Sequence, residues 1–312
     1  SSDLNIAAAY RGLEQYESAL EYYKKCLKAH QVLFGEDNVI VAITYTNIGE
    51  MYENLQQYEE GLDALMNGLY LKIRTLGQQH PSLASSLFKI GNIHMNLRKY
   101  DLAIQFLNKC IALQEHIHGA NHLDVAKTYQ SLGQAYFQMN EYGESHKYFF
   151  KSLEIYMNVV KGNDPEVGSC FANLGALFYA EQNFKQALNY YLLALEIYKV
   201  YYGEECELTA ICYSNIGLCY GSLEEHQKAL ENFQQSLNIR EKLQESGSVE
   251  IANLYVSIGS AHTNLNNYSE GVRFFKKAKE IYETLLEKDD PAVLDLDQNI
   301  RIAEEKVQET KN

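Results

Sequence analysis

Hydrophobic and polar residues follow one another along this chain with the period of an α-helix. Around Gly49, apolar residues stand four and one positions before it (Tyr45, Ile48) and three and six positions after it (Tyr52, Leu55). These spacings place the four side chains on one face of a helix, with the glycine among them. The pattern predicts a first helix that ends at the polar turn after Leu55.

A second stripe begins directly after that turn. Gly61, Leu65, Gly68 and Leu69 are separated by steps of three and four along one face. Large and small side chains alternate on this face, as interlocking helices require. Small residues on both stripes would let the two helix backbones approach each other. Together the stripes predict a helix hairpin.

The same pattern recurs every 42 residues without an insertion. Its origin falls at Ala7, Gly49, Gly91, Gly133, Gly175, Gly217 and Gly259. A fixed internal period of this kind is the signature of a repeat protein, in which each hairpin buries its apolar face against its neighbours. We predict seven repeats, over 1–37, 38–79, 80–121, 122–163, 164–205, 206–247 and 248–289. The eighth origin would fall on Arg301, so the charged segment 290–312 is expected to be a capping helix.

Short loops join the predicted hairpins. Glycines at 35, 77, 119 and 203 are expected to end the second helices as C-caps, and Pro81, Pro165 and Pro291 to open the helices that follow. Three prolines in 312 residues also suit long helices. With 46% hydrophobic residues the chain can bury a core. The predicted fold class is therefore all-α.

Charge and hydropathy exclude several classes of function. The net charge of −14 and the absence of a basic run argue against nucleic-acid binding and against an acidic membrane surface. No apolar run reaches the roughly 18 residues of a membrane span, and the N-terminus lacks the regions of a signal peptide. We expect a cytoplasmic protein without membrane insertion. Because the chain starts without Met, inside the first repeat, we also expect it to be a fragment.

The motifs of the repeat resemble those of a known family. Asn47, Ile48, Gly49 and Tyr52 in the first helix resemble the tetratricopeptide repeat, and the segment from Gly77 to Ala84 resembles its 42-residue, kinesin light chain type. The resemblance covers residues 1 to about 290. It implies an α-solenoid, a right-handed superhelix of about seven hairpins, with the first helices on the concave side. Association with the cytoskeleton or a cilium would agree with that resemblance.

The resemblance assigns a second stripe of the first helices to a peptide-binding groove. The stripe consists mainly of amides and small residues, whereas an ordinary solvated helix face carries more Lys and Glu. Amide side chains can pair with the backbone of an extended peptide. In the fifth and sixth repeats it is more apolar and would suit an aliphatic or aromatic anchor. Without Lys three positions before the origin, a clamp for a chaperone tail is not expected. The groove residues are Asn5, Asn47, Glu50, Asn54, Lys89, Asn92, Asn96, Gln130, Gln134, Gln138, Asn173, Ala176, Tyr179, Asn215 and Leu218.

Histidines and cysteines are the residues of this chain most able to bind a metal ion. His116, His118 and His122 lie within seven residues, but no carboxylate or cysteine completes a known metal spacing, so we expect no metal site. His94 and His262 replace Tyr in the core stripe and are expected to pack there. The six cysteines are expected to be reduced, and most of the 25 tyrosines to pack in the core.

The sequence contains no recognisable catalytic motif and no phosphate-binding loop, so we expect no enzyme activity and no cofactor. The first hypothesis is an interaction scaffold that binds a peptide or helix of a protein partner in its groove. Two alternatives stay open: an assembly element that docks in a larger motor, cytoskeletal or ciliary complex, and the regulatory domain of a multidomain protein. Partner identity and oligomeric state are not specified by these patterns.

Overall fold

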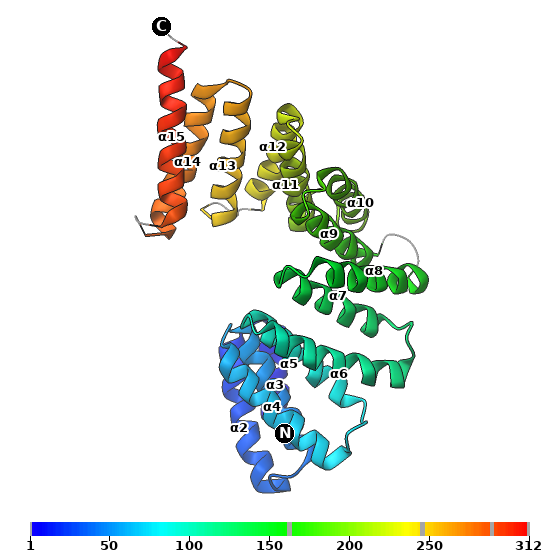
Figure 1. Ribbon diagram of the computed structural model, residues 1–312. Coiled ribbons are helices and arrows are strands. Elements are labelled where there is room, and N and C mark those ends of the chain that lie inside the picture. Colours follow the sequence, from blue (N-terminus) through cyan, green and yellow to red (C-terminus); the bar gives the residue numbers. More distant parts are fainter. Residues whose placement is uncertain (1, 161–163, 244–246, 288–289, 311–312) are drawn as a thin grey trace. The chain divides into compact units, whose positions relative to one another are not determined.

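The computed structural model describes residues 2–160, 164–243, 247–287 and 290–310, and within these ranges the chain is helical and contains no strand. The predicted repeat ends at 1, 163, 289 and 312 lie outside the described residues. Fifteen helices follow one another in the described part of the chain (Figure 1). They are α1 (Ser2–Gly12), α2 (Tyr16–Phe34), α3 (Val39–Asn54), α4 (Tyr58–Leu76), α5 (Ser82–Asn96), α6 (Tyr100–His118), α7 (Leu123–Gln138), α8 (Tyr142–Val159), α9 (Pro165–Ala180), α10 (Phe184–Tyr202), α11 (Glu207–Ser222), α12 (His226–Lys242), α13 (Val249–Asn264), α14 (Tyr268–Leu285) and α15 (Pro291–Glu309).

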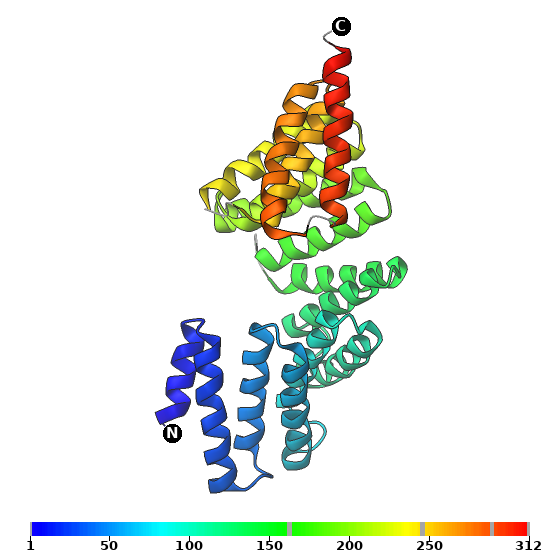
Figure 2. The same cartoon turned by 90° about the vertical axis from the view of Figure 1, so that its left-hand side faces the viewer.

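The chain divides into two compact units, residues 1–159 and 160–312. The first unit holds four helix hairpins, α1/α2 to α7/α8, and the second holds three, α9/α10 to α13/α14, followed by α15. Figure 2 shows the antiparallel helix pairs of each unit from a second side. The predicted α-solenoid of seven hairpins with a terminal helix is confirmed.

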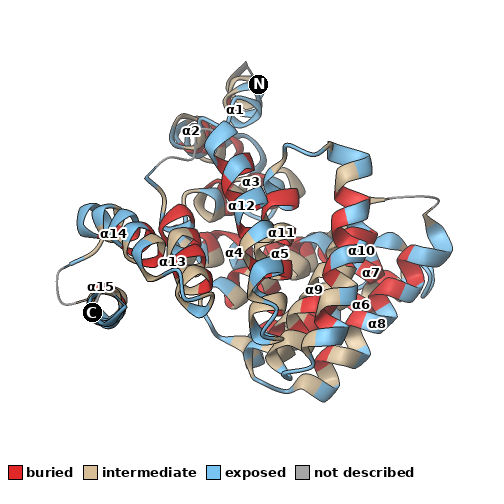
Figure 3. Cartoon of the chain, turned by 90° about the horizontal axis from the view of Figure 1, so that it is seen from above, coloured by how far each residue is buried: buried red, intermediate tan, exposed pale blue. Residues whose placement is uncertain are grey.

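In both units, first helices of successive hairpins also contact one another. Helix α5 contacts both α3 and α7, and α11 contacts α13. Inside a unit, each second helix packs against the first helix of its own hairpin and against the helix that begins the next one. The buried positions follow these contacts, as the red segments in Figure 3 show. Each unit therefore has a row of first helices, and we call the exposed side of that row the first-helix face.

The origin glycine is where a large side chain of the second helix enters the first. A Cβ at Gly133 would stand 2.5 Å from the Phe149 ring, and one at Gly217 would stand 2.5 Å from Phe233. Real Cβ atoms do not approach other atoms this closely, so the ring occupies the place of the missing side chain. The predicted close approach is confirmed, and the ring explains why the two columns are small and large.

The turn inside each hairpin has a left-handed residue that the sequence analysis did not identify. It lies seven positions after the origin in all seven repeats, and none of the seven is glycine. The residues are Glu14, Gln56, Arg98, Asn140, Gln182, Glu224 and Asn266, with φ between 55° and 62°. All seven are polar and unbranched at Cβ, which is the composition that this conformation tolerates after glycine.

The loops between hairpins follow the predicted caps with one shift. The four expected glycines end α2, α4, α6 and α10 with positive φ. Pro165 and Pro291 are the first residues of α9 and α15. Pro81 instead occupies the N-cap of α5, one residue earlier than a helix-opening proline.

Hydrogen-bonded pairs of buried side chains join successive hairpins of the first unit. Each pair links the end of a second helix to the next first helix, 14 residues later. The pairs are His30 with Thr44 (3.0 Å), Lys72 with Ser86 (2.8 Å) and Gln114 with Thr128 (2.9 Å). In the second unit one equivalent pair, Tyr198 and Cys212, is buried in an apolar cluster. Burial raises the pKa of the Cys212 thiol to about 12.

Helix α15 packs against the last hairpin through one apolar face. Val293, Leu296, Ile300 and Ala303 are buried, whereas Arg301 is exposed. Its other side is solvated, as a terminal cap of a repeat array requires. None of the described helices is long and apolar enough to cross a membrane.

Candidate functional site

The fifteen predicted groove residues all lie in first helices, and none of them is buried. Ten belong to the first unit and five to the second. Asn5, Asn54, Asn96, Gln138 and Leu218 are exposed, and the others are half-buried. The stripe is therefore a surface feature of the first-helix faces, as the packing pattern predicted.

Charges on the first unit's face are paired across three hairpins. Glu50 of α3 lies 3.6 Å from the Arg11 guanidinium of α1 and 3.2 Å from the Lys89 ammonium of α5. Burial raises the pKa of the neighbouring Glu53, while Lys89 lowers it to a smaller extent. Lys89 and Glu50, predicted as separate ligand contacts, thus form one network. A charged peptide group would have to compete with these ion pairs.

Beside this network the face is hollowed and lined by amides. Asn92, Asn96, Gln134 and Gln138 surround a hollow of about 450 Å³ between α5 and α7. All four belong to the predicted set. Met95, Arg98, Tyr100 and Ser131 complete the lining. Amide groups that face a hollow can donate and accept hydrogen bonds at once, so this surface suits a polar chain such as a peptide backbone.

The second unit's face contains a more apolar hollow. It has a volume of about 240 Å³ and lies between α11 and α13, with α12 as its floor. Tyr179 and Leu218, both predicted, line it together with Val256 and Phe233. The Tyr179 hydroxyl is 3.1 Å from the Ser222 hydroxyl at its edge. The size of the hollow matches a single aliphatic or aromatic side chain.

Several residues that line this apolar hollow were not part of the predicted site. Val256, Ser257, Ser260 and Asn264 of α13 and His226 of α12 all line it. Val256 and Ser257 stand three and two positions before the last origin, as Thr46 and the predicted Asn47 do before Gly49. This shared spacing is the signal from which Ser257 could have been predicted. Conversely, Asn5, Asn47, Gln130, Asn173 and Asn215 line neither hollow.

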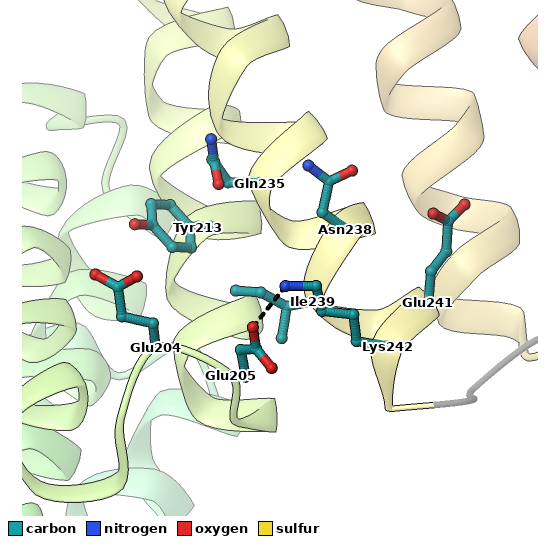
Figure 4. Close-up of a pocket in the computed structure, with 8 residues that line it drawn as sticks. All are labelled: Glu204, Glu205, Tyr213, Gln235, Asn238, Ile239, Glu241 and Lys242. Carbon is teal, nitrogen blue, oxygen red and sulfur yellow. Dashed lines mark hydrogen bonds and ion pairs between the residues drawn. The ribbon is translucent and has the colours of Figure 1, made fainter.

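A third hollow opens on the side of the second helices. Figure 4 shows it between the loop before α11 and helix α12, with Glu204, Glu205, Glu241 and Lys242 around it. Its volume is about 420 Å³. Lys242 Nζ donates to Glu205 Oε1 at 2.5 Å, and Lys199 pairs with Glu204 at 2.9 Å. These ion pairs tie the loop to α12 and α10, so we regard the hollow as structural.

His94 and His262 behave as packing residues; His94 is buried and His262 is half-buried. His94 stacks on Phe106 and His262 on Phe274, and burial lowers the pKa of both imidazoles. Their Nδ1 atoms have no hydrogen-bond partner among the described residues. All six cysteines are free thiols. The predicted packing role of the two histidines is confirmed.

Comparisons with known proteins agree with this architecture. Models of the tetratricopeptide repeat match residues 1–69, 82–158, 169–242 and 251–292. No curated protein is similar enough in sequence to count as a match. Solved structures share the fold at low sequence identity, and they include kinesin light chain-like repeats.

Three of these structures illustrate the range. The apo form of RapI is 20% identical with a TM-score of 0.69, over 92% of this chain and 77% of that chain. A putative kinesin light chain of Podosopora anserina with nearly identical TPR-like repeats is 17% identical with a TM-score of 0.56, over 67% of this chain and 99% of that chain. A STAND-type signal transduction ATPase with a tetratricopeptide repeat sensor from Pyrococcus horikoshii is 16% identical with a TM-score of 0.71, over 96% of this chain and 43% of that chain. This chain belongs to the tetratricopeptide repeat family.

Proposed function

We propose that the protein is a non-catalytic interaction scaffold that binds a peptide or helix of a protein partner on its first-helix faces. The observation that carries this proposal is the apolar hollow around Leu218 and Tyr179, which is rimmed by hydroxyl and amide groups. An apolar cavity with a few polar groups at its edge is the usual form of a site that anchors one side chain and orients the rest of a ligand.

The second unit supplies both parts of such a site. Leu218, Val256 and Phe233 provide apolar contact, while Ser222, Ser260 and Asn264 provide hydrogen-bonding groups at the rim. Leu218 is 40% exposed, which leaves apolar area for a ligand to cover. Covering it stabilises a complex by about 25 cal/mol per Å² of apolar surface. The preferred ligand is therefore a peptide with an aliphatic or aromatic anchor residue flanked by polar positions.

The amide hollow of the first unit supports the same function with a different preference. Its four amides offer donors and acceptors without a large apolar area. It suits the backbone and polar side chains of an extended segment. The Arg11, Glu50 and Lys89 network beside it favours a ligand without a strong net charge at that point, since a charged group would disturb ion pairs already formed.

The test is a selection of binding peptides from a random display library with the whole chain as bait. We expect enrichment of peptides with one aliphatic or aromatic anchor. Leu218→Glu should weaken their binding at least about tenfold, because it places a charge in the apolar hollow. Leu192→Glu is the matched control: Leu192 is 42% exposed but lies on α10, a second helix. If Leu218→Glu keeps wild-type affinity, or if no peptide is enriched, the proposal fails.

Docking of the second-helix side into a larger assembly is a second candidate. It rests on Val200, Tyr201 and Tyr202, an exposed apolar run at the end of α10. Such runs mark contact sites when they are contiguous. Tyr201→Lys should then reduce recovery of a cellular partner in pull-downs with the whole chain, while Leu218→Glu leaves it unchanged. The opposite pattern would assign the partner to the first-helix face.

A further inference from the structure

Two histidines and an aspartate lie together where α6 ends and α7 begins. His118 is the last residue of α6, His122 is the N-cap of α7, and Asp124 lies in its first turn. One ligand atom from each lies within 4.8 Å of the others. Imidazole and carboxylate are ligands that zinc takes in proteins. His116, the third histidine of this segment, is not part of the cluster.

The Asp124–His122 separation matches that between neighbouring ligands of a bound metal ion, and the separations to His118 are longer. Asp124 Oδ2 is 3.5 Å from His122 Nδ1 and 4.0 Å from His118 Nε2. Zinc ligands stand about 2.0–2.2 Å from the ion, so neighbouring ligand atoms of a tetrahedral site are about 3.3–3.5 Å apart. The imidazole rings of His118 and His122 are stacked, with centroids 4.2 Å apart. A turn of the His118 side chain, which is 38% exposed at a helix end, would close the site.

Helix capping explains only one of the three residues. His122 Nδ1 accepts a hydrogen bond from the Asp124 amide at 3.2 Å, and His80 makes the same contact with the Ser82 amide one repeat earlier. The earlier loop, however, has Leu76 in the place of His118 and Ser82 in the place of Asp124. A cap therefore needs the histidine alone. The two additional ligand-type residues have no counterpart in that neighbouring loop.

Space for a further ligand lies next to the cluster. His118 and Asp124 line a hollow of about 240 Å³, together with Phe88, Gln114 and Thr128. A metal held by three protein groups keeps a fourth position for water or for a ligand atom. The hollow offers room for that position. The cluster and the hollow are both within the first unit.

From this geometry we propose that His118, His122 and Asp124 form a binding site for one divalent cation of the zinc class. Because the His122 Nδ1 lone pair is used by the cap, its proton is placed on Nε2. A metal therefore replaces the cap at either nitrogen: at Nδ1 it takes the lone pair from the Asp124 amide, and at Nε2 it requires the ring proton to move to Nδ1, which then no longer accepts from that amide. Binding would fix the α6–α7 loop and so join the third and fourth hairpins. This site is independent of the peptide-binding proposal.

Calorimetric titration of the whole chain with zinc chloride, in a buffer that does not bind zinc, tests the proposal. The wild type should bind one ion at this site. His118→Leu, His122→Asn and Asp124→Ser introduce the residues found 42 or 84 positions earlier, at Leu76, Asn38 and Ser82. Asn38 also caps its helix, so His122→Asn keeps the cap. Each variant should weaken binding at least about tenfold, whereas His116→Ala should bind as the wild type does.

A spectroscopic readout separates this site from the free thiols. Cobalt(II) bound by imidazole and carboxylate lacks the charge-transfer band that a thiolate ligand produces. We expect the wild type with cobalt(II) to give a spectrum of the bound ion without that band. In the three variants the spectrum of the bound ion should be lost. Circular dichroism verifies that each variant is folded. Absence of zinc binding, a thiolate band, or unchanged affinity in the three folded variants would each overturn the proposal.

Discussion

Lys72 Nζ donates a hydrogen bond to Ser86 Oγ at 2.8 Å inside the junction between the second and third hairpins. The lysine is 5% exposed, and its partner is a neutral hydroxyl. Burial lowers the pKa of Lys72, and the Lys89 ammonium lowers it further. A charged group in this position is less stable than the same group in the unfolded chain. The buried Lys72 ammonium therefore destabilises the folded state at this junction.

We expect Lys72→Met to raise the free energy of unfolding at neutral pH by about 1–2 kcal/mol, because methionine fills a similar volume without a charge. The unfolded chain binds more protons than the folded chain between the lowered pKa and the ordinary value of 10.5. Wild-type stability should therefore rise with pH in this window, and the advantage of the variant should shrink. Urea denaturation of both proteins at neutral pH and near pH 10.5 measures the difference.

Lys72→Gln is the control for this prediction. Gln114 occupies the equivalent position of the next repeat and accepts a hydrogen bond from Thr128. Glutamine at 72 keeps a polar contact with Ser86 but removes the charge. It should also lose the pH dependence. A Lys72→Met variant that is less stable than the wild type at neutral pH would show that the ammonium group stabilises the junction.

Gly133→Ala should destabilise the protein by about 1–3 kcal/mol, because the new Cβ would lie 2.5 Å from the Phe149 ring and force it to move. Gly143 provides a control in the same hairpin. No atom lies within 4 Å of a Cβ at Gly143, which is in the first turn of α8. Gly143→Ala should be neutral or stabilise by up to about 1 kcal/mol. Thermal unfolding of the two variants should move in opposite directions.

Gln56→Gly should raise stability by about 0.5–1 kcal/mol, although it removes a side chain. Gln56 has φ of 59°, a conformation that costs an L-residue energy and glycine none. The adjacent Gln57 is the N-cap of α4 with φ of −90°, where glycine gains nothing and loses backbone entropy. Equal effects of Gln56→Gly and Gln57→Gly in urea denaturation would contradict the role assigned to the left-handed turn.

The combined variant His94→Tyr/His262→Tyr should reduce the loss of stability in acid. Burial lowers the pKa of both histidines below 6.5, so as pH falls through this range the unfolded chain takes up protons first and folding weakens. Tyrosine, the usual residue of this column, does not take up a proton there. Denaturation curves at neutral pH and below pH 6.5 should give a smaller difference in the free energy of unfolding for the variant than for the wild type.

The fold was predictable because the same pattern of core positions is repeated seven times. An atypical residue at one position in one repeat therefore did not obscure the pattern. The core stripes needed only the spacing around residues such as Gly49 and Leu65. The left-handed turn was harder to predict: Gln56 and its equivalents are polar residues in a polar turn, and no glycine marks the conformation. Its signal was a uniform absence of β-branched side chains at that position.

The candidate sites were only partly predictable because they depend on which residues meet across helices. Spacing within one helix placed Leu218 on the exposed stripe, but not beside Val256 of the next hairpin. The pairing of Lys72 with Ser86 crosses a loop and involves two positions that neither helix pattern links. Likewise, Asp124 joins His118 only when the α6–α7 loop has its folded shape.

The apolar clusters have a consequence for how the chain is made. Tyr23 and Met51 belong to one apolar cluster, which joins the first two hairpins. Leu65 and Ile93 belong to a second cluster, which joins the second and third hairpins. Phe233 and Ile258 belong to a third cluster near the C-terminus. Each cluster is complete once the following hairpin has been synthesised. Contacts this local favour rapid folding. We therefore expect the hairpins to fold one after another while the chain is still being translated. Nascent chains of increasing length should gain protease resistance one repeat at a time.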